Sequence, residues 1–200
     1  MDFKEALIKN KKIAILVASG APRDAYFAGA ALSLVAKEMG KEVTLIAKDN
    51  VPEEAAELAF FQNEPGQKNL VISFDYTPET IEKVRYFSED GAFNLILSPI
   101  PKDFNPENIR YSYTVPNFDL WVLFGISDLN AIPSALSEYK EEIIASQKVV
   151  FADKPAFGEL QIDISNQGYS ANLFTLLSRA NLVPSAITAK ALLLGLSGIA

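Results

Sequence analysis

Uninterrupted apolar runs alternate along the chain with segments in which apolar residues recur at helical spacing. Residues 13–18 (IAILVA) form such a run, which is typical of a strand buried on both faces of a parallel sheet. From Ala28 to Met39 apolar residues recur every three or four positions and predict a helix that Gly40 ends. A second apolar run follows at 43–47 (VTLIA). This order, with short connections, predicts a βαβ unit.

The same alternation returns in the last part of the chain, where apolar runs and helical stripes follow one another again. The predicted elements are, in order, a strand at 120–124, a helix at about 131–145, strands at 149–152 and 160–164, and helices at about 169–180 and 184–196. Strands that alternate with helices predict an α/β fold with a doubly wound, mostly parallel sheet.

Between about residues 70 and 115 the pattern changes to short β-prone segments separated by turn sequences. Segments 81–87 and 92–98 flank the turn sequence Ser-Glu-Asp-Gly. In the second segment every other residue is a large apolar one, namely Phe93, Leu95 and Leu97. We therefore predict an antiparallel β insertion at about 70–115 within a single domain of residues 1–200.

Composition excludes several classes of chemistry. The chain of 200 residues contains no histidine and no cysteine, which excludes Ser–His and Cys–His nucleophilic pairs, disulfides and Cys-ligated zinc. Its net charge of −7 argues against a nucleic acid held through its backbone. No secretory signal is evident at the N-terminus, and no apolar stretch approaches the roughly 20 residues that span a bilayer. We therefore predict a cytoplasmic protein with no membrane partner.

Several segments, taken in their order along the chain, resemble the DHH phosphoesterase superfamily, in particular its oligoribonuclease and nucleotide-phosphatase branch. Residues 39–43 (MGKEV) match the Leu-Gly-Lys pattern after the first helix, and residues 157–160 (FGEL) match a Phe-Gly segment. Residues 186–196 (AITAKALLLGL) match the closing helix. The resemblance covers most of residues 12–60 and 117–200. It implies the N-terminal domain of such an enzyme, without the C-terminal domain that grips the substrate.

The resemblance also implies a pair of divalent cations, usually manganese, held by carboxylates and histidines. Ser19 stands for the family's first histidine, and Arg23 and Ala25 stand for the two aspartates of its first loop. Gly125 stands where a strand ends in a ligand aspartate, and residues 152–154 (ADK) replace the Asp-His-His triplet. The resemblance thus implies a vestigial site without metal, whose candidate residues are Ser19, Arg23, Asp24, Gly125, Asp128, Asp153 and Lys154.

Three functional hypotheses follow. The first is a catalytically inactive DHH-like domain that acts as a binding or assembly module without a cofactor, with the 70–115 insertion as a surface for a protein partner. The second is a metal-dependent phosphodiesterase or nucleotide phosphatase with an altered ligand set. In it, oxygen donors converge on manganese or magnesium, as hard cations prefer; the donors would be Asp24, Asp128, Asp153 and Asp75.

The third hypothesis is a metal-free nucleotide-binding domain, in which loop 19–24 holds a phosphate at a helix N-terminus. The competing interpretation of this loop is structural: Ser19 makes a turn, Asp24 caps the helix that follows, and Arg23 is solvated. Asp153 and Lys154 similarly form either a vestigial acid/base pair or ordinary surface charges.

The last 15 residues, 186–200, predict self-association. They contain one charged residue, Lys190, and their apolar residues nearly encircle the helix. A helix that is apolar all round must be buried. We therefore predict a homodimer, or a tendency to aggregate, with the C-terminal end at or near the contact.

Overall fold

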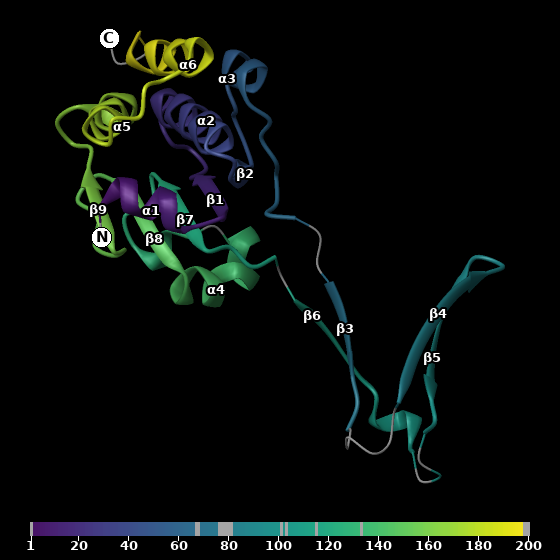
Figure 1. Cartoon of the computed structure of the whole chain (residues 1–200). Helices are drawn as coiled ribbons and strands as arrows, with labels where there is room; N and C mark the ends of the chain where they lie inside the picture. Colours follow the sequence, from purple (N-terminus) through teal and green to yellow (C-terminus); the bar gives the residue numbers. More distant parts are fainter. Residues whose placement is uncertain are drawn as a thin grey trace. The chain divides into compact units, whose positions relative to one another are not determined.

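The computed structural model describes residues 2–66, 69–75, 82–100, 102, 104–114, 116–132 and 134–197. The chain divides into two compact units (Figure 1). Unit 1 consists of Met1–Gln67 and Val115–Ala200, and unit 2 consists of Lys68–Thr114.

Unit 1 is built on a five-stranded sheet with the strand order β2-β1-β7-β8-β9, in which every neighbouring pair is parallel. The strands are β1 (Lys12–Val17), β2 (Glu42–Ile46), β7 (Leu120–Phe124), β8 (Gln147–Ala152) and β9 (Leu160–Asp163). Each strand overlaps one of the apolar runs that predicted it. The central strands β1, β7 and β8 are buried on both faces, whereas the edge strands β2 and β9 are partly exposed.

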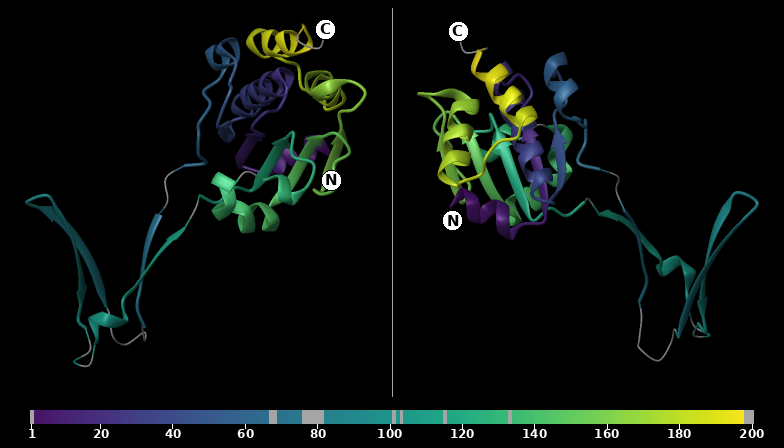
Figure 2. Two further views of the ribbon diagram at one scale, coloured as in Figure 1. Left: turned by 180° about the vertical axis from the view of Figure 1, so that it is seen from behind. Right: turned by 45° about the horizontal axis from the view of Figure 1, so that its top comes forward.

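Helices cover both faces of this sheet (Figure 2), so the predicted α/β class is confirmed. Side chains from alternate positions of β1 enter two separate cores: Ile13 and Ile15 face one, and Leu16 faces the other. The first core packs against α1 (Phe3–Lys9), α2 (Arg23–Glu38), α3 (Glu53–Leu58), α5 (Gly168–Arg179) and α6 (Ala186–Ser197). The second packs against the segment that contains α4 (Lys140–Ala145).

Helix α2 lies between the sheet and α6 (Figure 1). A Cβ built at Gly29 would lie 3.0 Å from Cγ2 of Val17 in β1, so the small residues of α2 allow the helix to lie close on the sheet. Helix α6 packs against α2 and buries Ala191 and Leu192. Leu194 is partly buried, whereas Ile187, Leu193 and Leu196 are exposed. The dimer predicted at this helix stays a prediction.

The helix predicted at about 131–145 is wrong for most of its length. The segment forms the 3₁₀ helices η2 (Leu129–Ala131) and η3 (Ser134–Tyr139), and only α4 is α-helical. Leu136 interrupts the helical geometry with φ −109° and ψ 15°. Its side chain is nevertheless buried with those of Tyr139 and Ile143. The apolar spacing that suggested a helix therefore reflects packing of these side chains into the core.

Unit 2 consists of two antiparallel ribbons, as the sequence predicted. Strands β3 (Asn69–Ser73) and β6 (Arg110–Thr114) pair with each other, and η1 (Pro106–Asn108) precedes β6. Strands β4 (Lys83–Glu89) and β5 (Ala92–Ser98) form a hairpin around the turn Asp90-Gly91. No helix in the described part of either unit is long and apolar enough to cross a membrane.

Candidate functional site

The candidate residues gather at the edge of the sheet where the parallel strands end. Ser19 follows β1, Gly125 follows β7, and Asp153 follows β8, and these strands are neighbours in the order β1-β7-β8. Asp24 lies in the first turn of α2, which begins at the same edge. In open α/β sheets this is the edge at which ligands bind. The topology therefore places these four residues at one edge of the sheet. Their individual contacts show whether they are available to a ligand.

Asp24 does not cap its own helix, which corrects the sequence-based interpretation. The N-cap of α2 is Pro22, and Asp24 is the second residue inside the helix. Its buried carboxylate accepts hydrogen bonds from the backbone N–H groups of Tyr169 (2.6 Å) and Ser170 (3.0 Å). These are first-turn groups of α5, whose own N-cap residue Gln167 provides no side-chain cap. Asp24 therefore caps a distant helix, where its negative charge also meets the positive end of the helix dipole.

Helix α6 closes over this cap. A Cβ built at Gly195 would lie 2.0 Å from Ser170 Oγ and 2.7 Å from Asp24 Oδ1, so only a glycine allows α6 to approach so closely. Burial raises the pKa of Asp24, although the hydrogen bonds from Ser170 and Tyr169 act to lower it. Sequence reasoning missed Tyr169, Ser170 and Gly195. The available signal was a helix start at Gln167-Gly168 without a capping side chain.

Gly125 occupies the position of the expected strand-end aspartate, and its surroundings leave no room for one. Its φ is +81°, which strains any residue with a Cβ. A Cβ built there would lie 3.2 Å from Ala18 Cβ, 3.3 Å from Ala21 Cβ and 3.5 Å from the Tyr169 hydroxyl. Burial, with smaller contributions from Asp24 and Asp153, raises the pKa of Tyr169 to about 12. A neutral hydroxyl and two methyl groups therefore fill this space.

The loop before α2 is tied to acidic residues. Ser19 Oγ donates a hydrogen bond to Asp49 Oδ2 (3.2 Å). Arg23 is not simply solvated, as one interpretation had it: its guanidinium pairs with Glu54 (2.7 Å) and lies 5.2 Å from the centroid of the Phe27 ring. The groups that would recognise a phosphate are thus already engaged with carboxylates, and the nucleotide hypothesis gains no support from this loop.

Because Arg23 and Glu54 are both about half exposed, we expect Arg23→Ala to lower the free energy of unfolding by less than about 1 kcal/mol. We also expect a panel of mononucleotides to leave the melting temperature of both proteins unchanged. Thermal-shift measurements check both points. A nucleotide-dependent shift in the wild type that disappears in Arg23→Ala would revive the nucleotide hypothesis.

The remaining carboxylates do not converge. Asp128 Oδ1 accepts a hydrogen bond from the backbone N–H of Asn130, two residues further along the chain (2.6 Å). Asp153 is exposed. Asp75 belongs to unit 2, where it pairs with Arg110 (3.1 Å). Across the residues that the structure describes, no group of three or more histidine, cysteine, aspartate or glutamate side chains could hold a metal ion. The convergence that the altered-ligand hypothesis requires is therefore not found there.

Lys154 and the adjacent Asp153 are both exposed, and the charge of Lys154 acts on Asp163. Hydrogen bonds from Ser165 are the main cause that lowers the pKa of Asp163, and Lys154 adds to them. The exposure of both side chains favours their interpretation as ordinary surface charges.

Comparison with known proteins identifies the fold. No protein-family model and no curated protein matches the chain. Among solved structures, an exopolyphosphatase-related protein from Bacteroides fragilis matches with a TM-score of 0.57 and 14% sequence identity. The match covers 98% of this chain and 49% of that one. The chain therefore shares the fold of this exopolyphosphatase-related protein and spans about half of its length.

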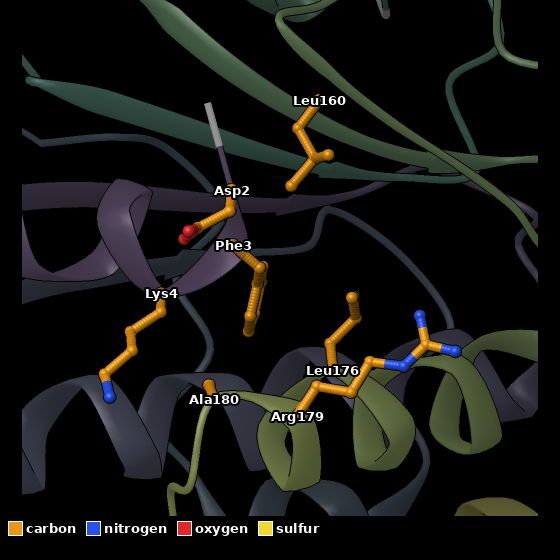
Figure 3. A pocket seen from close by; sticks show the side chains of 7 residues that line it. All are labelled: Asp2, Phe3, Lys4, Leu160, Leu176, Arg179 and Ala180. Atoms are coloured by element: carbon orange, nitrogen blue, oxygen red, sulfur yellow. The ribbon is translucent and has the colours of Figure 1, made fainter.

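A pocket of about 410 Å³ is lined by residues of α1 and of the C-terminal end of α5 (Figure 3). Asp24 contacts the N-terminal end of α5. Phe3 and Leu176 point into the space between α1 and α5, while the charged ends of Lys4 and Arg179 lie to its sides. The Asp2 carboxylate accepts a hydrogen bond from Glu5 N (2.7 Å) as the cap of α1. The size suits a small molecule, but the polar groups do not converge on a common point.

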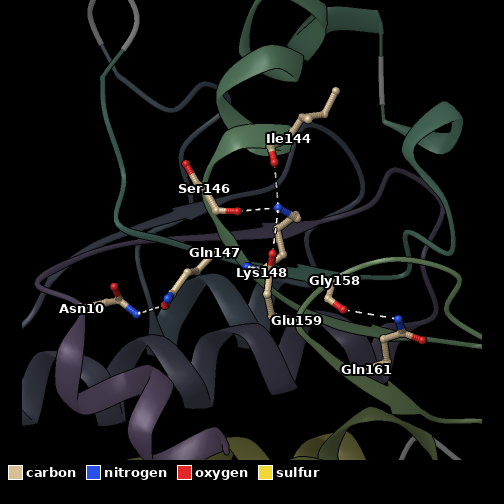
Figure 4. Close-up of polar contacts among 8 residues, drawn as sticks. All are labelled: Asn10, Ile144, Ser146, Gln147, Lys148, Gly158, Glu159 and Gln161. Atoms are coloured by element: carbon tan, nitrogen blue, oxygen red, sulfur yellow. Dashed lines mark hydrogen bonds and ion pairs between the residues drawn. The ribbon is translucent and has the colours of Figure 1, made fainter. Parts of the chain in front are cut away.

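A buried lysine in unit 1 serves the fold (Figure 4). Lys148 Nζ donates hydrogen bonds to the carbonyl oxygens of Ile144 (3.0 Å) and Ser146, and it lies 3.5 Å from Glu159 Oε1. The first two carbonyls belong to the end of α4, where a cation meets the negative end of the helix dipole. Because all donors are directed at structural partners, Lys148 is not a candidate for chemistry.

Proposed function

We propose that unit 1 is a catalytically inactive phosphoesterase-like domain and that the protein works as a binding or assembly module. The observation that carries this proposal is the state of Asp24. Both oxygens of its carboxylate accept hydrogen bonds from the start of α5, and α6 closes over them. A metal ion at Asp24 would have to displace these bonds and uncap α5.

The surroundings of Gly125 support the same proposal. A two-metal phosphoesterase needs several carboxylates or imidazoles around one space. Here that space is lined by Ala18, Ala21 and the Tyr169 hydroxyl. None of these groups is a good ligand for a hard divalent cation, which prefers carboxylate and carbonyl oxygens. The donor set therefore does not fit a metal pair, and the role left to the domain is to bind or to position a partner.

Titration with manganese tests the proposal. We expect isothermal titration calorimetry of the full chain to show no site tighter than about 1 mM, and we expect no manganese-dependent hydrolysis of bis-p-nitrophenyl phosphate. Asp153→Asn is the matched control, because Asp153 is exposed and its replacement leaves the fold intact. A tight site or turnover in the wild type would overturn the proposal, and its loss in Asp153→Asn would place the metal at this edge of the sheet.

A further inference from the structure

The described part of unit 2 has no core of its own. None of the described residues from 69 to 114 is buried, and all seven residues of β4 are exposed. An isolated two-stranded hairpin is at best marginally stable in water, and sheets normally gain stability by covering an apolar face. Within the described part of unit 2, the hairpin of β4 and β5 therefore lacks a layer that covers its apolar residues.

The two faces of this hairpin differ in chemistry. Opposite residues of an antiparallel pair share a face, and the register pairs Val84 with Leu97 and Tyr86 with Leu95. Phe93 lies on the same face and stacks on Tyr86 with a centroid distance of 5.7 Å. We call this side, which carries Val84, Tyr86, Phe93, Leu95 and Leu97 and no charged residue, the apolar hairpin face. The charged strand residues Lys83, Arg85 and Glu89 all lie on the opposite face.

We propose that the apolar hairpin face binds the same face of a second copy of this chain. The inference rests on the proposed assembly role and names the partner. Because the face has no charge, it offers no ion pair to the phosphates of a nucleic acid, to a charged peptide or to an anionic lipid headgroup. Its match is a second uncharged apolar surface, and an identical copy supplies one through a two-fold contact.

The size of the face fits such a contact. Tyr86 is 74% exposed, Phe93 68%, Val84 62% and Leu95 44%. Each of the two aromatic side chains offers roughly 100–170 Å², and the whole face offers about 400 Å² per copy. Two copies then bury about 800–1,000 Å² with their polar rims, an area at the low end of specific interfaces that suits a weak dimer.

The shape of the face also suits a two-fold axis through its middle. The bulky Phe93 lies near the turn, and the smaller Val84 lies at the other end of the strands. If two hairpins cross in opposite directions, Phe93 of one copy packs over Val84 of the other. Large and small side chains then alternate across the contact, as they do in well-packed cores.

Sedimentation equilibrium of the full chain tests this proposal. The test variant Phe93→Ser/Leu95→Ser removes one aromatic and one aliphatic side chain from the apolar hairpin face. The control Phe87→Ser/Ile96→Ser removes the same kinds of side chain from the opposite face, where they are 42% and 43% exposed. We expect a wild-type dimer between about 1 and 200 µM. The dissociation constant should rise at least about tenfold in the test variant and less than about threefold in the control.

Three measurements keep the result unambiguous. Trp121 is the chain's one tryptophan and is buried in unit 1, so its fluorescence should report the same melting temperature for all variants. Leu193→Ser on α6 should leave the dimer intact. A wild-type protein that stays monomeric overturns the proposal. Binding of this monomer to phosphatidylcholine vesicles would mean that the face contacts lipid instead. Equal effects of the two hairpin variants, or loss of the dimer in Leu193→Ser, overturn it as well. Manganese-dependent turnover would overturn the proposed function whatever the oligomeric state.

Discussion

Replacement of Asp24 by alanine is expected to lower the free energy of unfolding of unit 1 by about 2–4 kcal/mol. The substitution leaves the backbone N–H groups of Tyr169 and Ser170 buried under α6 without an acceptor. In a domain of this size the melting temperature should fall by roughly 5–15 °C. Chemical denaturation followed by Trp121 fluorescence measures the change, because Trp121 lies in the core of the same unit.

Asp24→Asn is the matched control, since it keeps the shape and one acceptor oxygen, and we expect it to lose less stability than Asp24→Ala. It also removes a titrating group. Burial raises the pKa of Asp24 above its usual 3.8, so the folded protein binds this proton more tightly than the unfolded chain does. The resulting contribution to stability is complete below pH 3.8 and is lost as the pH rises through the folded pKa.

The difference in free energy of unfolding between the wild type and Asp24→Asn should therefore narrow as the pH rises from 3.8 through the raised pKa of Asp24 in the folded protein. If Asp24→Ala were as stable as the wild type, the carboxylate would not be acting as a cap. The site would then be free for a ligand.

Much of unit 1 could be predicted because its central strands β1, β7 and β8 are buried on both faces and appear as apolar runs. The run at 120–124, for example, corresponds to β7 residue for residue. Short helices escaped the same reasoning, because α1 has only seven residues and too few turns to show a period. The hairpin of β4 and β5 was predicted from its alternation and its turn sequence. Its lack of a core was not, because an alternating pattern does not say what covers the apolar side.

The sequence predicted which edge of the sheet carries the candidate residues, but it did not predict which groups these residues contact. Ser19, Gly125 and Asp153 follow consecutive strands of one sheet, so any correct strand assignment brings them to one edge. The partners of Asp24 lie 145 and 146 residues away in the chain, and no local pattern encodes such a pairing. Whether Asp24 caps its own helix α2 or the distant helix α5 depends on how α5 packs against α2, and this packing is not encoded in any local segment.

Introduction of an aspartate at Gly125, the position expected to carry a metal ligand, should destabilise the protein rather than restore a site. The backbone there has φ +81°, and the new Cβ would lie 3.2 Å from Ala18 and 3.3 Å from Ala21. Conformational strain and overpacking together predict a loss of about 2–5 kcal/mol. We expect no gain of manganese affinity, because Asp24 remains bound to α5 and cannot serve as the second ligand.

Gly40→Asp separates the two causes. Gly40 has a similar φ of +74°, but a Cβ there meets nothing within 4 Å. This control therefore carries the backbone strain alone, which amounts to about 1–2 kcal/mol. Urea denaturation of both variants should show that Gly125→Asp is the less stable by at least about 1 kcal/mol. Equal losses would mean that Ala18 and Ala21 move aside easily. A calorimetric manganese site in Gly125→Asp would mean that the space is a metal centre lacking one ligand, and the inactive assignment would be wrong.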